Sequence, residues 1–228
     1  MFNINKDVQP NTISKDEDNY RVLNFRYIFN KPNVIKRLQY AVNLEFGSSF
    51  TKLSTDIRYR KFFALEKSFD LRFFGGVFLN NNADTNYFDF GLNQSSDYLF
   101  EQNLFGRSEN SGVFSQQFIT SDGGFKSNFK QPYTANQYIF AGNTSISIWK
   151  WFEVYNDAAV LKNRDQKRKF FYENGIRFNF IPNIFELYFP VYTNEGWEIN
   201  KEAYPSKIRF VFTTNIDQIY NFIRRGIL

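Results

Sequence analysis

Hydrophobic and polar residues alternate along much of this 228-residue chain, most clearly from Gly175 to Tyr192. Within this stretch one set of side chains shares an apolar face: Ile176, Phe178, Phe180, Phe185, Leu187, Phe189 and Val191. A second set shares the opposite face: Arg177, Asn179, Glu186, Tyr188 and Tyr192. Such period-2 alternation is typical of strands with one apolar and one polar face. A break at Ile181-Pro182-Asn183 predicts that the two arms form a hairpin.

The same pattern recurs along the chain and predicts an antiparallel sheet. Long strands are expected over residues 21–29, 37–46, 52–60, 68–79, 137–149, 153–161, 170–180, 184–192 and 207–214. Shorter or weaker strands are expected over residues 87–92, 97–105 and 113–120. Residues 121–136 show no alternation and are interpreted as an extracellular loop or a plug inside a barrel. The count is about 10 to 12 strands, and even-numbered closure is usual for bacterial barrels.

The polar face of the first strands carries charges of both signs, which offers two interpretations. Its residues are Arg37, Gln39, Asn43, Glu45, Asp56, Arg58, Arg60, Asp70 and Arg72. In a membrane barrel these residues face the lumen and pair across strands, whereas in a soluble β-sandwich they face outward. Strands of about 10 to 14 residues suit a tilted membrane crossing better than a sandwich. We therefore expect an all-β, antiparallel transmembrane β-barrel, complete or partial, with the soluble β-sandwich as the alternative.

Aromatic residues support the membrane interpretation. They make up 21% of the chain, with 30 Phe and 14 Tyr, and they favour a pleated surface over helix. Trp149 and Trp151 lie at a predicted turn, as expected of an aromatic girdle at a membrane interface; the alternative is a pair of Trp residues buried at the end of a sandwich core. The mean hydropathy of −0.48 does not decide between the two, because the polar interior of a barrel cancels its lipid face in any average.

The expected organisation is a polar N-terminal segment, residues 1–20, followed by a single β-barrel domain, residues 21–228. The first residues lack the basic and apolar regions of a secretory signal. Since outer-membrane proteins are exported, we expect the chain to be a mature or excised piece of a longer protein.

The chain has no His and no Cys, which restricts its chemistry. Neither a Ser-His-Asp or Cys-His triad nor an H-E-x-x-H zinc site can be formed, and no cofactor is expected. The net charge of +5 is dispersed among apolar residues rather than gathered into a patch, so nucleic acid is not an expected partner. The expected partner is the lipid bilayer.

Three stretches carry a family resemblance: GIRFNFIPNIFELYFPVYTNEGWEINKEAYPSKIRFVFT, NLFGRSENSGVFSQQF and ISIWKWFEVYNDAAVLKN. They resemble the C-terminal outer-membrane β-barrel region of Bacteroidetes M1-type (gluzincin) metallopeptidases, most distinctively in FELYFPVY and GWE. The resemblance implies a zinc peptidase domain upstream of this chain and an outer-membrane location in a Gram-negative bacterium. It carries no catalytic residue onto any position here.

The leading functional hypothesis is a non-catalytic outer-membrane β-barrel module that anchors such a peptidase or serves as a barrel subunit of a membrane assembly, with an upstream peptidase domain or other outer-membrane subunits as partners. A second hypothesis is a soluble glycan-binding module that uses Trp149, Trp151 and Trp197 as a stacking platform. A third is a hydrolase with paired carboxylates, either Glu153 with Asp157 or Glu45 with Asp56.

Overall fold

A single antiparallel sheet of ten strands dominates the structure, a computed structural model that describes residues 2–3, 19–31, 33, 35–65, 67–93, 98–99, 112–129, 133–164, 166–181 and 184–212. The long strands are β3 (Val22–Lys31), β4 (Lys36–Gly47), β5 (Phe50–Ala64), β6 (Lys67–Asn81), β9 (Tyr138–Trp149), β10 (Phe152–Lys162), β11 (Lys169–Ile181) and β12 (Phe185–Thr193). Two short strands, β13 (Gly196–Trp197) and β14 (Arg209–Phe212), pair with different parts of β12. The sequence alternation therefore predicted the all-β class and the long strands correctly.

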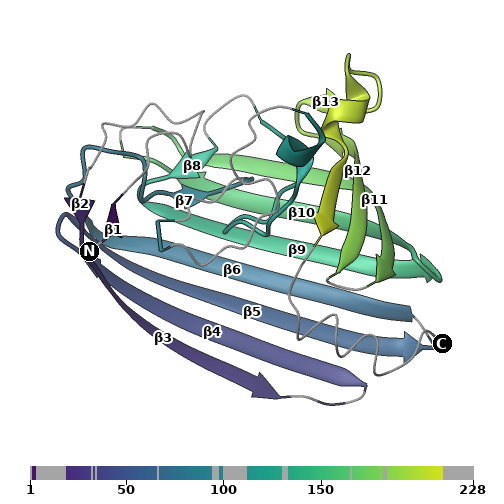
Figure 1. The fold of residues 1–228 in the computed structure, drawn as a ribbon, viewed down its shortest axis with the longest axis horizontal. Coiled ribbons are helices and arrows are strands. Elements are labelled where there is room, and N and C mark those ends of the chain that lie inside the picture. Colours follow the sequence, from purple (N-terminus) through teal and green to yellow (C-terminus); the bar gives the residue numbers. More distant parts are fainter. Residues whose placement is uncertain are drawn as a thin grey trace.

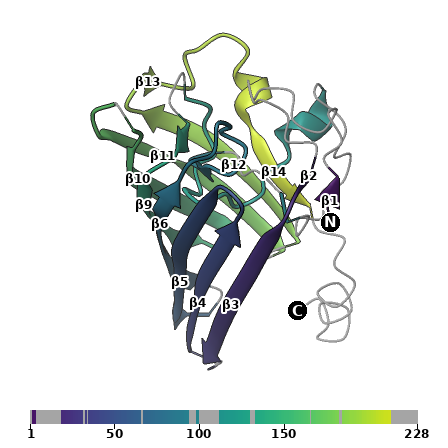
Figure 2. The ribbon, with the colours of Figure 1, turned by 90° about the vertical axis from the view of Figure 1, so that its left-hand side faces the viewer.

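The sheet is curved, and its two edges are not paired with each other among the described residues (Figures 1 and 2). Its order is β13-β12-β11-β10-β9-β6-β5-β4-β3, with β14 attached to β12. No closed barrel is present in this part of the chain, and no second large sheet packs against the first as in a sandwich. The finer prediction of a closed barrel thus stays a prediction. No helix in the described ranges is long and apolar enough to cross a membrane.

The connections between strands differ in length at the two ends of the sheet. Strands β3 and β4, β5 and β6, β9 and β10, and β11 and β12 are joined by short turns at one end, here called the short-turn end. The opposite end carries the two longest connections, residues 82–137 and residues 194–208. We call this the long-connection end.

The described parts of residues 82–137, here called the covering region, lie against one face of the sheet, which we call the inner face; the opposite face is the outer face. They contain the short strands β7 (Phe90–Gly91) and β8 (Thr134–Ala135), which pair with each other, and a 3₁₀ helix, η2 (Val113–Gln116) (Figure 1). A second 3₁₀ helix, η3 (Tyr204–Lys207), lies in the last connection. The main apolar cluster joins this region to the sheet and consists of Phe74, Phe90, Leu92, Phe125, Phe129, Ala135, Ile139, Ala141, Ala159, Leu161 and Phe171.

Close packing in this cluster depends on a glycine in β6. A Cβ on Gly76 would lie 2.5 Å from the ring of Phe90, so a larger residue there would push β7 away from the sheet. A second cluster at the long-connection end joins residues near the start of the sheet to this region: Tyr20, Phe50, Tyr87, Phe88 and Tyr98. Tyr20, the last residue of the predicted N-terminal segment, is buried there and belongs to β2 (Asn19–Tyr20), which pairs with β1 (Phe2–Asn3). Residues 4–18 lie outside the described residues.

Two of the three weaker strand predictions are wrong. Residues 113–120 begin as a 3₁₀ turn, because the Ser115 amide and hydroxyl both donate to the Gly112 carbonyl (3.2 and 2.7 Å). Of residues 87–92 only Phe90 and Gly91 form a strand, and its partner is β8. The third of these expected strands, residues 97–105, lies mostly outside the described residues and stays a prediction. The last strand begins at Arg209 rather than Lys207, since η3 precedes it.

One face assignment is also wrong. Gly175 pairs with Pro190 and Asn174 with Tyr192, so Val191 is an extra residue that forms a bulge in β12. The bulge reverses the alternation beyond it. Tyr192 therefore joins the apolar face, where its ring contacts those of Tyr172 and Trp197, while Thr193 is buried on the inner face.

Candidate functional site

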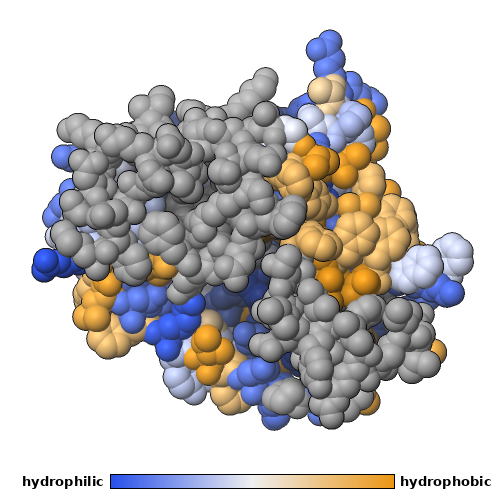
Figure 3. All heavy atoms as spheres, viewed as in Figure 1, coloured by the Kyte–Doolittle hydropathy of each residue, from blue (hydrophilic) through white to orange (hydrophobic). Residues whose placement is uncertain are grey.

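The outer face of the sheet is apolar and exposed, although the described residues place no layer over it. Its exposed side chains on the long strands include Leu23, Phe25, Tyr27, Val42, Phe46, Leu53, Ile57, Leu71, Phe73, Phe140, Ile146 and Phe170. Phe25 and Phe170 are each 57% exposed. Figure 3 shows apolar residues gathered at the right, where β11 and β12 lie, and alternating with polar residues along the lower edge near β3. Exposed apolar faces of this extent are typical of surfaces that contact lipid or another protein.

The inner face has the opposite character, because its charged groups are buried. Asp157, Glu173, Glu153, Glu186 and Arg177 are all below one tenth exposed. Carboxylates and guanidinium groups are seldom fully buried unless they are paired. The inner face thus combines buried ion pairs with the main apolar cluster, whereas the outer face exposes apolar side chains.

The nine predicted polar-face residues lie on this inner face, in β4, β5 and β6. Asp56 accepts from Arg58 (3.0 Å) and from Arg72 (3.0 Å), and Arg60 forms an ion pair with Asp70. Asn43 donates to Glu45 (2.6 Å), which also accepts from the Tyr98 hydroxyl. The other two members differ from these: Gln39 lines a cavity, and Arg37 is exposed opposite Arg60. That this face lines a water-filled lumen stays a prediction.

Lys52 connects the inner face of β5 to the covering region. Its ammonium donates to the Phe88 carbonyl and to the Tyr98 hydroxyl, both at 2.8 Å, and lies 4.5 Å from the centre of the Phe90 ring. Burial raises the pKa of Asp89 to about 7, although the nearby Lys52 charge opposes the shift. Burial likewise raises the pKa of Asp122, again against Lys52. Both carboxyl groups therefore bind a proton more readily in the folded protein than in the unfolded chain.

Arg177 of β11 is the centre of a buried cluster in the other half of the sheet. Its guanidinium contacts Glu186 (2.6 Å) and Glu153 (3.2 Å), and donates to the Ser145 hydroxyl (3.3 Å). It also lies 5.5 Å from the centre of the Tyr188 ring. One arginine thereby holds carboxylates from β10 and β12 together.

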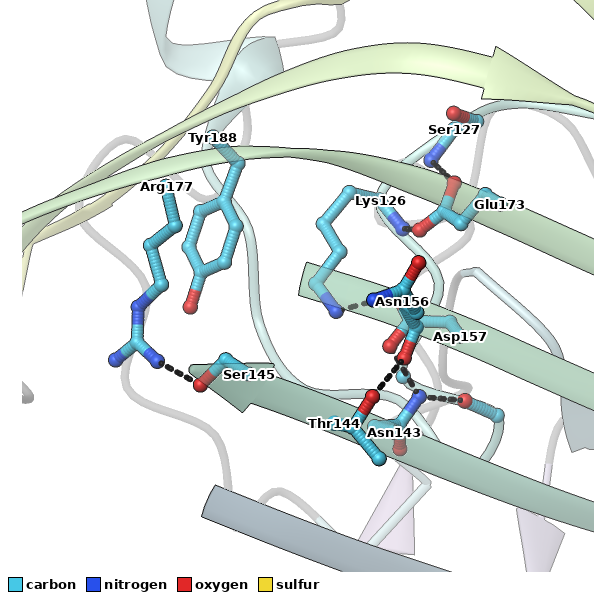
Figure 4. Close-up of polar contacts among 12 residues, drawn as sticks. Lys126, Ser127, Asn143, Thr144, Ser145, Asn156, Asp157, Glu173, Arg177 and Tyr188 are labelled. Atoms are coloured by element: carbon cyan, nitrogen blue, oxygen red, sulfur yellow. Dashed lines mark hydrogen bonds and ion pairs between the residues drawn. The ribbon is translucent and has the colours of Figure 1, made fainter. Parts of the chain in front are cut away.

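Lys126 reaches the inner face from the covering region, on the other side of the same ring. Its ammonium donates to Asp157 (2.6 Å) and lies 5.5 Å from the centre of the Tyr188 ring. Figure 4 shows Arg177, Tyr188 and Lys126 extending into the same interior region. Glu173 accepts from the backbone amides of Lys126 (2.6 Å) and Ser127 (2.8 Å), and these hydrogen bonds hold this part of the covering region against β11.

Two cavities lie between the sheet and the covering region. One, of about 330 Å³, is lined by Glu45, Lys52, Asp56, Asp89 and Asp122, among others. The other, of about 390 Å³, is lined by Arg60, Arg72, Lys126, Tyr155 and Tyr188, among others. Both have mixed charge, which suits polar solutes or water better than an apolar ligand.

The tryptophans do not form one platform. Trp149 (70% exposed) and Trp151 (54% exposed) lie at the short-turn end, where the Trp151 ring contacts Phe180. Trp197 contacts Tyr192 at the opposite end of β12. The predicted three-residue glycan platform is therefore wrong in its geometry, and so is the expectation of a buried Trp pair in a sandwich core.

The carboxylates nominated as catalytic pairs bind separate partners. Glu153 binds Arg177, whereas Asp157 binds Lys126 and Asn143. Glu45 and Asp56 are likewise held by different donors, as described above. Within the described ranges no cluster of three or more metal-ligating side chains occurs.

Comparison of the chain with protein-family models, with curated proteins and with solved structures finds no match. The resemblance to peptidase-associated barrels thus rests on the sequence stretches alone.

Sequence reasoning identified the polar face of β4–β6 but overlooked Lys126, Glu173 and Tyr155. Glu173 lies four positions before Arg177 and Tyr155 lies two positions after Glu153, so period-2 alternation alone would have placed both on the inner face. Nothing in the sequence around Lys126 distinguishes it from an exposed loop lysine.

Proposed function

We propose that this chain is a non-catalytic membrane module whose outer face contacts the hydrocarbon of an outer membrane. The observation that carries the proposal is the contrast between the two faces of the sheet, with exposed apolar side chains outside and buried ion pairs inside. This arrangement is typical of outer-membrane barrels, in which lipid-facing and interior residues alternate along each strand.

Strand length supports the proposal. β10 has 11 residues; at about 3.3 Å per residue and a tilt of about 40° it would extend about 28 Å along the membrane normal. The apolar band of outer-membrane barrels is about 25 Å tall. The other long strands of the sheet, apart from β12 and β3, are at least as long as β10.

Aromatic residues at both ends of the outer face support it further. Trp149 and Trp151 lie at the short-turn end, while Tyr172, Tyr192 and Trp197 lie near the long-connection end. Trp and Tyr favour the two membrane–water interfaces. Since barrels have short periplasmic turns and longer extracellular loops, we place the short-turn end in the periplasm.

The sheet edges have to be paired in lipid, because unpaired backbone groups are costly there. In the described residues β3 forms one edge, and β13 and β14 form the other. The proposal therefore includes closure by further strands, from the rest of this protein or from partner subunits. The role as anchor of an M1-type peptidase is the part of the proposal that rests on the sequence resemblance alone.

Reconstitution tests the membrane proposal. The purified chain should float with phospholipid vesicles in a density gradient and show heat-modifiable mobility in detergent gels. A stable monomer in buffer without detergent would contradict it. The peptidase link is tested separately, because an uninterrupted upstream reading frame with an H-E-x-x-H motif must precede this sequence.

A further inference from the structure

The Lys126 ammonium lies in a cage made of side chains from three parts of the chain. Tyr155 and Asp157 come from β10, Tyr188 from β12 and Phe118 from the segment after η2. The ammonium lies 4.7 Å from the centre of the Tyr155 ring, 5.5 Å from that of Tyr188 and 5.6 Å from that of Phe118. Asp157 supplies the charged contact, at 2.6 Å.

This combination is suited to one class of ligand. Aromatic faces attract cations within about 6 Å of the ring centre, and the attraction is strongest where water is excluded. The Asp157 side chain is fully buried and that of Lys126 is 8% exposed. A primary ammonium on an unbranched stem donates to the carboxylate while its charge meets the rings, whereas a quaternary ammonium has no N–H to donate.

The cage and the backbone of the covering segment are held independently of the Lys126 side chain. Glu173 accepts from the amides of Lys126 and Ser127 (2.6 and 2.8 Å), and Arg209 donates to the Lys126 carbonyl (3.1 Å). The Asp157 carboxylate is also held by Asn143, at 2.9 Å. Truncating Lys126 would thus leave the receiving groups in place, beside the cavity of about 390 Å³.

We propose that the inner face carries a binding site for primary alkylammonium groups, formed by Asp157, Tyr155, Tyr188 and Phe118, which the chain fills with its own Lys126. The covering segment is thereby an internal ligand of the sheet. A primary amine that enters the adjacent cavity competes with Lys126 for the site. This inference depends on the interior geometry and is independent of the membrane proposal.

Chemical rescue tests the site. Lys126→Ala removes three methylene groups and the ammonium, which n-propylammonium replaces. A reporter is available because the chain has no Cys: Ser127 is 4% exposed, and its hydroxyl makes no hydrogen bond to any described residue. In a Ser127→Cys background we expect Lys126→Ala to raise the rate of labelling by a hydrophilic maleimide about tenfold or more.

Added n-propylammonium should return the labelling rate toward that of the Lys126 parent, with a saturable response near millimolar concentration, as suits so small a ligand. n-Propanol, which has the same shape without the charge, should not. The response should disappear in Lys126→Ala with Asp157→Asn. Lys150→Ala, which removes an exposed turn lysine 5.7 Å from the Trp151 ring, should change neither the labelling nor its response to the amine.

The site is overturned if Lys126→Ala labels at the parent rate, or if propanol protects as well as the amine does. Should Lys126→Ala not fold, its refolding yield must rise with n-propylammonium but not with propanol; an equal yield in both also overturns the site. Vesicle flotation of the same samples keeps the two proposals separate. Amine rescue without flotation would support the ammonium site and contradict the membrane function. Flotation without rescue would support the membrane function and contradict the ammonium site.

Discussion

The two halves of the sheet have the same outer face but different inner faces. In β9–β12 the inner side chains are buried beneath the covering region, and their charges pair across strands, as Arg177 does with Glu153 and Glu186. In β3–β5 the inner face is more open: the Arg58 side chain is 54% exposed, and Arg37 has no ion-pair partner among the described residues. Because both halves expose apolar residues on the outer face, the apolar character of that face does not depend on how the inner face is packed.

The largest expected effect comes from the covered half. Arg177→Met leaves two buried carboxylates without their cation and should lower the free energy of unfolding by about 3–5 kcal/mol. Denaturant titration of the folded protein measures this loss. Arg177→Lys, which keeps the charge, should lose less. Equal losses for the two variants would show that packing, and not charge, holds this cluster.

The outer face should respond alike in both halves. Leu44→Arg in β4 and Ile146→Arg in β9 should each lower the stability of the vesicle-inserted protein by about 1–3 kcal/mol. An arginine costs about 2–4 kcal/mol at the bilayer midplane and less toward the interfaces, and both residues lie between the middle and one end of their strands. Asn43→Arg, one position away on the inner face, is the control and should insert normally. Equal tolerance of Leu44→Arg and Asn43→Arg would refute the assignment of the two faces.

The covering region should make stability depend on pH. Burial raises the pKa of Asp89 to about 7, compared with about 4 in an unfolded chain. The folded state therefore holds the Asp89 proton between these values, so the contribution of Asp89 to stability falls as the pH rises from about 4 to about 7 and is constant above that. Thermal unfolding across this range should show a smaller slope in Asp89→Asn. Part of the slope should remain, because burial also raises the pKa of Asp122; an unchanged slope would exclude Asp89 as a source.

The smallest effect is expected in the open half. Arg58→Met removes a partly exposed partner of Asp56, which keeps its contact with Arg72 at 3.0 Å. Exposed pairs contribute about 0–1 kcal/mol, so denaturant midpoints should hardly move. A loss as large as that of Arg177→Met would mean that the open half is covered in the assembled protein.

The sequence was sufficient for the long strands and for most of their faces. Alternation over residues 37–46 and 170–180 identifies the bounds of β4 and β11 to within about two residues, because each strand has one face toward the outer surface and one toward the interior. It failed beyond Val191, where a single extra residue reverses the faces without any change in composition. It also failed for residues 113–120, whose 3₁₀ turn is formed by local bonds to the Gly112 carbonyl.

The interior site could not be predicted because its contacts join distant residues. Lys126 meets Asp157 across 31 positions and Glu173 across 47. Such contacts depend on how the irregular connection lies over the sheet, and no periodicity encodes that placement. The ion pairs of β5 and β6 are easier to anticipate, since Arg60 and Asp70 are direct cross-strand neighbours.

The long connection between β6 and β9 also bears on how the molecule assembles. Most of the other neighbouring long strands follow each other through a short turn, so hairpins can form locally and quickly. Pairing of β6 with β9 instead has to enclose residues 82–137, with the larger entropic cost of closing a long loop. We therefore expect the pairing of β6 with β9 to be the slowest strand-pairing step in folding.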